Sequence, residues 1–157
     1  MRITQWGEYG TLCALHIARL SRDGKSPVGA SDIAEALSIA TDYTQQVLQR
    51  LRKGNIVESI RGPNGGYCLA KPEEEITLKN ILIAAEGETF EIICDTKPIS
   101  QERCATSVPC NLRDIWQDLK THIDTYLDSK TLADLIYESD TKGLPVQIGT
   151  WSKEKAL

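Results

Sequence analysis

Residues 41–70 read TDYTQQVLQRLRKGNIVESIRGPNGGYCLA, and this stretch decides the fold. Its apolar residues recur at helical spacing as far as Leu51, and Gly54 follows as a C-terminal stop, so the pattern predicts a helix. Two short runs of strand-forming residues come next, 56–60 and 67–70, with a glycine-rich turn between them. The sequence therefore predicts a helix that leads directly into a β-hairpin.

A second short helix is predicted just before this stretch. It begins with Ser31 as its cap and ends near Ser38. Two short helices joined by a tight connection form a helix-turn-helix, and a hairpin directly after them forms a wing. The expected fold class is mainly α with a small β-hairpin wing, in which a winged helix-turn-helix domain is followed by a long dimerisation helix.

The second helix of this unit carries side chains suited to double-stranded DNA. Amide, hydroxyl and guanidinium groups pair with base edges and phosphates in the major groove. A cation at the hairpin tip is placed to enter a minor groove, where the negative potential is enhanced. The alternative is an ordinary solvated helix face. The predicted DNA contacts are Tyr43, Thr44, Gln45, Gln46, Gln49, Arg50 and Arg61.

Two further helices complete the predicted DNA-binding domain, which spans residues 1–87. Apolar residues at helical spacing predict a first helix over 4–20. Another helix starts after Thr77 as N-cap and stops at Gly87. The glycines of the wing are not followed by a Lys-Ser or Lys-Thr pair and a helix, so a nucleotide-binding P-loop is not expected.

The second half of the chain predicts a dimerisation helix. Apolar residues at spacings of four, three, four and three form a seam of the coiled-coil type, with charged residues on the other face. Pairing with a second copy is favoured over docking on the same chain, and a short helix and a tail follow. We expect residues 112–138 to form the dimerisation helix with the short following helix, and 139–157 the tail. The seam residues are Leu112, Trp116, Leu119, Ile123 and Tyr126.

Between the two halves, residues 88–111 hold three thiols: Cys94, Cys104 and Cys110. Soft thiolates select zinc, copper(I) or iron-sulfur clusters. Structural zinc sites usually have pairs of ligands separated by two to four residues, and no two of these three cysteines are that close in sequence. An iron-sulfur cluster is therefore favoured over redox-active thiols without metal and over zinc.

Composition limits the remaining functional classes. The net charge is −4, but residues 1–75 hold nine basic and nine acidic side chains, so the acidic excess lies in the second half. No apolar run approaches the roughly 20 residues of a membrane span, and the first residues lack a signal-peptide pattern, so we expect a cytoplasmic location. An enzyme using a cysteine with His16 or His122 is disfavoured, because no glycine-framed nucleophile is present. No catalytic residue is expected.

The sequence resembles the winged-helix iron-sulfur transcription regulator family that includes IscR, NsrR and RirA. The resemblance is carried by Tyr43, residues 48–57, the wing at 59–70, residues 76–78, Glu86-Gly87, the three cysteines and residues 131–135.

The resemblance implies a cytoplasmic homodimer that reads a two-fold operator and senses redox state, nitric oxide or iron-sulfur status. It also implies a [2Fe-2S] or [4Fe-4S] cluster on Cys94, Cys104 and Cys110. In the family, the fourth ligand can be a histidine three residues past the last cysteine, but this chain has Arg113 there. It can instead be an acidic residue near the start of the first helix, and Glu8 of the partner subunit matches that position. The interval from Cys94 to Cys104 is longer than the family pattern, which leaves the role of Cys94 open. The alternative is a cluster-free regulator with a thiol switch or a protein partner.

Overall fold

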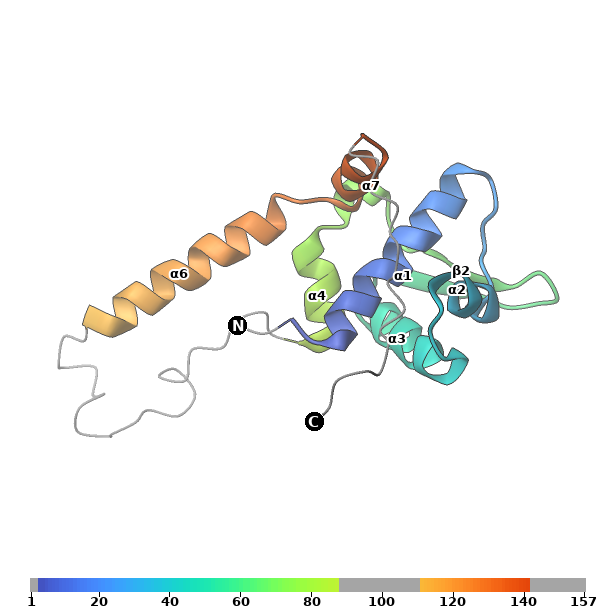
Figure 1. The fold of residues 1–157 in the computed structure, drawn as a ribbon, viewed down its shortest axis with the longest axis horizontal. Coiled ribbons are helices and arrows are strands. Elements are labelled where there is room, and N and C mark those ends of the chain that lie inside the picture. Colours follow the sequence, from blue (N-terminus) through green and yellow to red (C-terminus); the bar gives the residue numbers. More distant parts are fainter. Residues whose placement is uncertain (1–2, 88–110, 142–157) are drawn as a thin grey trace, which may run out of the picture.

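The computed structural model describes residues 3–87 and 111–141, without the side chains of residues 111, 139 and 140. These residues form a helical domain with a two-stranded antiparallel hairpin, so the expected fold class is confirmed (Figure 1). The elements are α1 (Gln5–Arg22), α2 (Ala30–Leu37), α3 (Thr41–Lys53), β1 (Val57–Ile60), β2 (Gly66–Leu69), a 3-10 turn (Glu73–Glu75), α4 (Leu78–Glu86), α6 (Asn111–Asp128) and α7 (Leu132–Thr141).

Helices α2 and α3 form the predicted helix-turn-helix, but their caps differ from the expectation. Helix α2 begins at Ala30 with Gly29 as its N-cap, and no side chain caps it. The prediction of a Ser31 cap is therefore wrong by two residues. The Gly29 carbonyl accepts the first helical hydrogen bond, from the Ile33 amide at 3.0 Å, which leaves Ser31 inside the helix.

The end of α3 depends on a close approach rather than on a left-handed glycine. Gly54 has φ −83°, and the left-handed residue is Asn55, with φ 56°. A Cβ on Gly54 would lie 2.3 Å from the Cβ of Ala84 in α4. Gly54 is the C-cap that ends α3, as the sequence predicts, and its lack of a side chain also lets α3 pack against α4.

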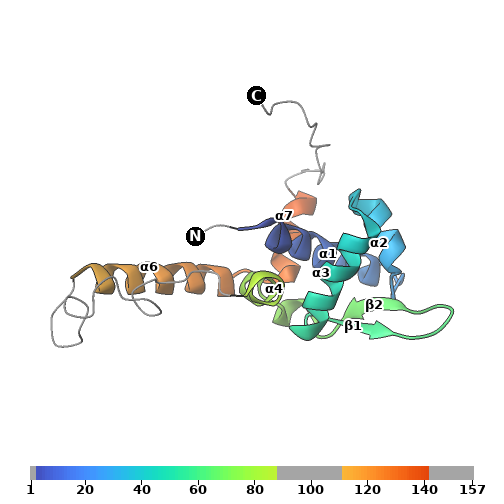
Figure 2. The ribbon, with the colours of Figure 1, turned by 90° about the horizontal axis from the view of Figure 1, so that it is seen from below.

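The wing is a regular hairpin. Its register pairs Val57 with Leu69 and Ile60 with Gly66. At its base, Val28 exchanges two backbone hydrogen bonds with Tyr67, at 2.9 and 2.8 Å. The hairpin is thus tied to the segment before α2, and Figure 2 shows it extending beyond the helices.

One hydrophobic core joins α1, α3, α4 and α7. Helix α7 contributes Leu132 and Ile136, which are almost fully buried in the same cluster as Ile17 and Leu48. The Leu132 amide donates to the Ile76 carbonyl at 2.8 Å. The sequence groups this short helix with the long one, whereas in the structure it packs on the DNA-binding domain.

Helix α6 extends away from that domain (Figures 1 and 2). Its C-terminal end is tied to α4, because Lys79 forms ion pairs with Asp128 at 2.8 Å and Asp124 at 3.7 Å. Among the described helices, none has the length and apolar character needed to cross a membrane.

Candidate nucleic-acid interface and sensor residues

The exposed face of α3 carries the three glutamines that the sequence predicts as DNA contacts. Gln45, Gln46 and Gln49 are exposed, whereas Val47 and Leu48 between them are buried. The helical period therefore separates an amide-bearing stripe from a core-facing stripe. Amides at this spacing can form bidentate hydrogen bonds with adenine edges in a major groove.

Thr44 lies on the opposite side of the helix from that stripe. It is fully buried, and its hydroxyl donates to the Ala40 carbonyl at 3.1 Å. The hydroxyl therefore has no route to a DNA groove in this structure. The hydroxyl group of Thr44 is chemically suited to DNA, but the helical period places this side chain among the core residues. Thr44 is therefore not among the proposed DNA contacts.

Tyr43 and Arg50 both contact other helices of the protein, although Arg50 remains exposed. The ring of Tyr43 lies 4.5 Å from that of Trp6 and 5.6 Å from that of Tyr9, measured between centroids. The guanidinium of Arg50 lies 4.0 Å from the Trp6 ring centroid and donates from Nη1 to the Ala85 carbonyl at 2.8 Å. Burial raises the pKa of Tyr43. These two predicted contacts are held by α1 and α4.

Arg52 is a candidate that the sequence-based prediction missed. It is exposed, and its Nη1 donates to Ser59 Oγ on β1 at 3.2 Å, so it links α3 to the wing. It follows Gln49 by three residues and Gln45 by seven, which places it on the same helical stripe. That spacing is a signal that could have identified it.

The wing tip presents Arg61 on a glycine turn. Arg61 is exposed directly after β1. Gly62 has φ +126°, and its carbonyl accepts from the Gly65 amide at 2.9 Å. A Cβ on Gly65 would lie 2.3 Å from the Ile60 carbonyl oxygen. Glycines therefore let the turn adopt a positive φ and close tightly behind Arg61.

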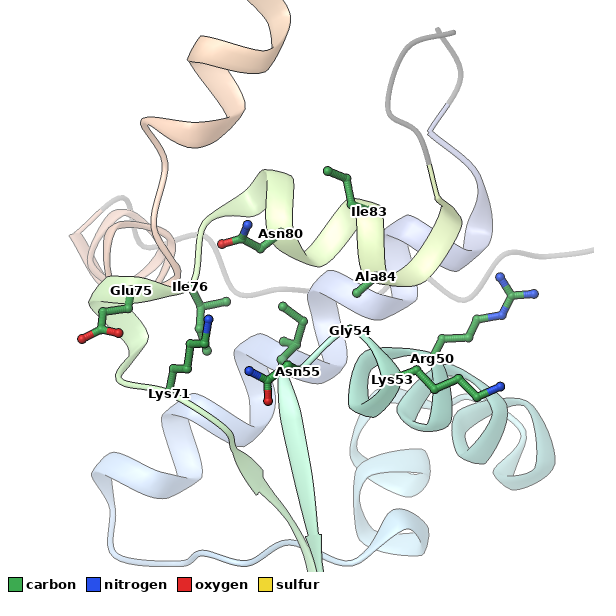
Figure 3. Close-up of a pocket in the computed structure, with 11 residues that line it drawn as sticks. Arg50, Lys53, Gly54, Asn55, Lys71, Glu75, Ile76, Asn80, Ile83 and Ala84 are labelled. Atoms are coloured by element: carbon green, nitrogen blue, oxygen red, sulfur yellow. The ribbon is translucent and has the colours of Figure 1, made fainter. Parts of the chain in front are cut away.

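A groove lies between the end of α3, the start of β1 and α4. Ile56, Ile76 and Ala84 give it an apolar floor, and Asn55 and Asn80 add amides. Figure 3 shows Arg50 and Lys53 leaving α3 and pointing away from the other lining residues. The groove therefore does not gather these cations into an anion site.

Of the predicted cluster ligands, Glu8 lies within the described residues and the three cysteines do not. Cys94, Cys104 and Cys110 lie outside the described residues. Glu8 is exposed in the first turn of α1, and its carboxylate makes no hydrogen bond or ion pair with the rest of the described chain. Within residues 3–87 and 111–141, no three potential metal ligands come together.

The two cysteines that the structure describes have other roles. Cys13 is fully buried in the core, and burial raises its pKa to about 12. Cys68 lies on β2 and donates from Sγ to Glu58 Oε1 at 3.4 Å. Burial and this hydrogen bond raise the pKa of Cys68. Both environments favour the thiol over the metal-binding thiolate.

The apolar seam of α6 lies open in the single chain. Leu112, Trp116, Leu119 and Tyr126 keep between 40% and 61% of their surface exposed, and Ile123 is half-buried. Leu127, by contrast, is buried. The seam thus forms a continuous apolar strip of the kind that marks a protein interface.

Comparison with known proteins agrees with this architecture. The Rrf2 family, described as iron-dependent transcriptional regulators, matches residues 3–138. The HTH-type transcriptional regulator IscR of Yersinia enterocolitica is 35% identical over 140 residues, which cover 89% of this chain and 82% of that protein.

Two solved structures share the fold. IscR of T. potens has a TM-score of 0.70 and 27% identity, with 92% of this chain and 93% of that one covered. CymR of B. subtilis, a global cysteine regulator, has a TM-score of 0.68 and 26% identity, with 88% of this chain and 98% of that one covered. These relatives are regulators and not enzymes. The chain belongs to the Rrf2 family and is a DNA-binding transcriptional regulator of the winged helix-turn-helix type.

Proposed function

We propose that this regulator senses redox state, nitric oxide or iron-sulfur status through an iron-sulfur cluster. The proposed ligands are Cys94, Cys104 and Cys110 of one subunit and Glu8 of the partner subunit. The donor set fits such a group, since thiolates hold iron-sulfur clusters. A carboxylate in place of a fourth thiolate makes a weaker and more exchangeable ligand, as a sensor needs.

The observation that carries the proposal is the placement of Glu8. Its carboxylate is exposed and has no partner within the described residues, so it is free to ligate. It lies two residues after Trp6, whose ring stacks on Tyr43 of α3. A ligand bond to Glu8 would therefore act on the same turn of α1 that contacts the reading helix.

The regulator is proposed to act as a homodimer on double-stranded operator DNA. The α6 seams of two copies pair, and the two α3 helices then face successive major grooves about 34 Å apart. Gln45, Gln46 and Gln49 contact base edges, and Arg61 enters the adjacent minor groove. When bound, the cluster supplies redox and ligand-exchange chemistry, and Glu8 transmits its state to α1.

Purification without oxygen tests the cofactor directly. We expect a brown or pink protein that contains iron and sulfide and absorbs visible light. Cys104→Ser and Cys110→Ser should lose the colour, while Cys68→Ser, the matched control in the wing, should keep it. Loss of colour in Cys94→Ser would make Cys94 the third ligand.

Glu8→Ala tests the carboxylate ligand, with Glu74→Ala as the control at another exposed acidic position. Glu8→Ala should speed the loss of the cluster in air or nitric oxide with little change in folding. Identical spectra and operator binding in both variants would exclude Glu8 as a ligand.

The second candidate is a cluster-free regulator that works through thiols or a protein partner, and the fold is shared with CymR, a global cysteine regulator. A colourless protein without iron and sulfide after anaerobic purification would favour it. Oxidant-dependent operator binding that is lost in Cys104→Ser would then identify a thiol switch.

A further inference from the structure

Arg50 occupies an unusual position for a residue predicted to contact DNA. Its guanidinium lies over the Trp6 ring, 4.0 Å from the centroid, and donates to the Ala85 carbonyl at 2.8 Å. Trp6 belongs to α1 and Ala85 to α4. The planar guanidinium is thus used to join three helices, a task that its stacking face and fixed fork of donors suit.

Trp6 holds α3 at a second point. Its ring also lies 4.5 Å from that of Tyr43, with an angle of 35° between the planes. Tyr43 and Arg50 are seven residues apart, which corresponds to about 10 Å along a helix. Contacts at two points along one axis restrain both the tilt and the rotation of α3, whereas one contact would leave the tilt free.

The start of α1 is itself fixed to the end of α4. The Thr4 amide donates to Glu86 Oε1 at 2.9 Å. Gly7 passes so close to that carboxylate that a Cβ there would overlap it, and the added atom would also lie 2.8 Å from Leu82. The α1 start, the α4 end and α3 therefore form a closed set of contacts around Trp6.

We infer that Trp6 and Arg50 are positioning residues that set the orientation of α3 for operator binding, and that Arg50 does not read a base. The inference rests on the proposed function, in which the exposed glutamines of α3 contact the operator. Without the two contacts, α3 samples more orientations, and operator binding must supply the free energy of ordering it. Specific affinity then falls although no DNA contact has been removed.

The test uses a duplex that the wild-type protein selects from a random pool. Affinity is measured by fluorescence anisotropy for this operator, for each of its single-base-pair variants and across a range of salt concentrations. Trp6→Ala and Arg50→Ala should each weaken operator binding about tenfold. The double variant should lose clearly less than the product of the two single losses, because both single variants already remove the Arg50–Trp6 contact.

Two features separate positioning from direct contact. Base-pair preferences and the salt slope should stay those of wild type, since neither side chain touches a base or a phosphate. Arg50→Lys should not restore affinity, because an ammonium lacks the planar stacking face, whereas Trp6→Phe should restore part of it. Gln49→Ala is the matched control on α3 and should lose preference at one base pair.

Hydrogen exchange in the free protein gives a readout that needs no DNA. The α3 amides should exchange about tenfold faster in Trp6→Ala and in Arg50→Ala than in wild type. In Trp6→Phe the increase should be smaller, and the urea midpoints of the variants should follow the same order. The inference is overturned by unchanged exchange, by multiplicative losses in the double variant, or by a lost preference at one base pair in Arg50→Ala. Failure of wild type to select any duplex would instead count against the proposed DNA contacts, while the exchange result would still decide on the positioning role.

Discussion

Replacing Gly54 by alanine should destabilise the protein by a steric conflict that the structure locates. The new Cβ would lie 2.3 Å from the Cβ and 3.0 Å from the Cα of Ala84. Carbon atoms in contact normally lie about 3.5–4.0 Å apart. Neither Ala84 atom can rotate away, so α3 and α4 would have to separate by about 1 Å.

Two opposing effects set the magnitude. Overpacking a well-packed contact costs about 1–3 kcal/mol. Gly54 has φ −83°, which alanine adopts without strain, so the loss of glycine freedom in the unfolded chain returns about 0.4–1 kcal/mol. We therefore expect Gly54→Ala to lower the free energy of unfolding by about 1–2 kcal/mol, and Tm by roughly 2–4 °C per kcal/mol.

Urea unfolding followed by circular dichroism measures this change, as a lower midpoint with an unchanged slope. Gly29→Ala is the matched control, because Gly29 has φ −65° and the nearest atom to its added Cβ is a carboxylate oxygen of Asp32, which can rotate away. The double variant Gly54→Ala/Ala84→Gly should lose less than the sum of its two single variants, since the colliding methyl is gone. An unchanged or higher midpoint for Gly54→Ala, or strict additivity in the double variant, would refute the steric argument.

Four further outcomes are expected. Burial lowers the pKa of His16, so the unfolded chain binds a proton before the folded one does as pH falls below about 6.5. The stability of the wild-type protein should therefore decline over this pH range. The urea midpoint of His16→Gln should decline less than that of wild type. Thr77→Ala removes the side chain that caps α4 and should cost about 1 kcal/mol in the same assay, while a loss within error would mean that water replaces the cap. Arg61→Ala should weaken anisotropy-measured binding most on operators with A·T-rich minor grooves, and an equal loss on all sequences would make Arg61 a phosphate contact. Leu119→Asp places a charge in the α6 seam and should give monomers in sedimentation velocity. The control Thr121→Asp, on the opposite side of the helix, should remain dimeric. If both variants are dimeric, the seam is not the interface.

Local chemistry made much of the fold predictable. The N-cap of α4 is an example, because its signal lies within four residues. Thr77 Oγ1 accepts from the Asn80 amide at 3.2 Å, and Asn80 Oδ1 accepts from the Thr77 amide at 3.1 Å. The hairpin was equally predictable, because its strands and its glycine turn are contiguous in sequence. Where one short segment supplies both partners of an interaction, sequence reasoning can find it.

The candidate site was less predictable because its geometry depends on distant residues. Gly54 was assigned to a helix stop by a local rule, yet its neighbour is Ala84, thirty positions later. Tyr43 and Arg50 have the right chemistry for DNA, but Trp6, at the start of the chain, turns both toward the protein. No local pattern contains these partners, so residue type alone could not show which candidate side chains the fold engages in contacts of its own.

The acidic character of the whole chain does not oppose DNA binding once its charges are located. Several described carboxylates are paired with cations away from α3 and the wing: Glu73 with Arg22, Asp128 with Lys79 and Glu138 with Lys130. Along α3 and the wing, by contrast, Arg52, Lys53 and Arg61 form no ion pair with any described carboxylate. Because exposed charges more than about 8 Å apart are largely screened at physiological salt, a phosphate near α3 experiences these local cations more than the distant net charge. Operator affinity should therefore fall steeply with added salt although the protein and the DNA are both negatively charged, and a flat salt dependence would mean that these cations do not face the phosphates.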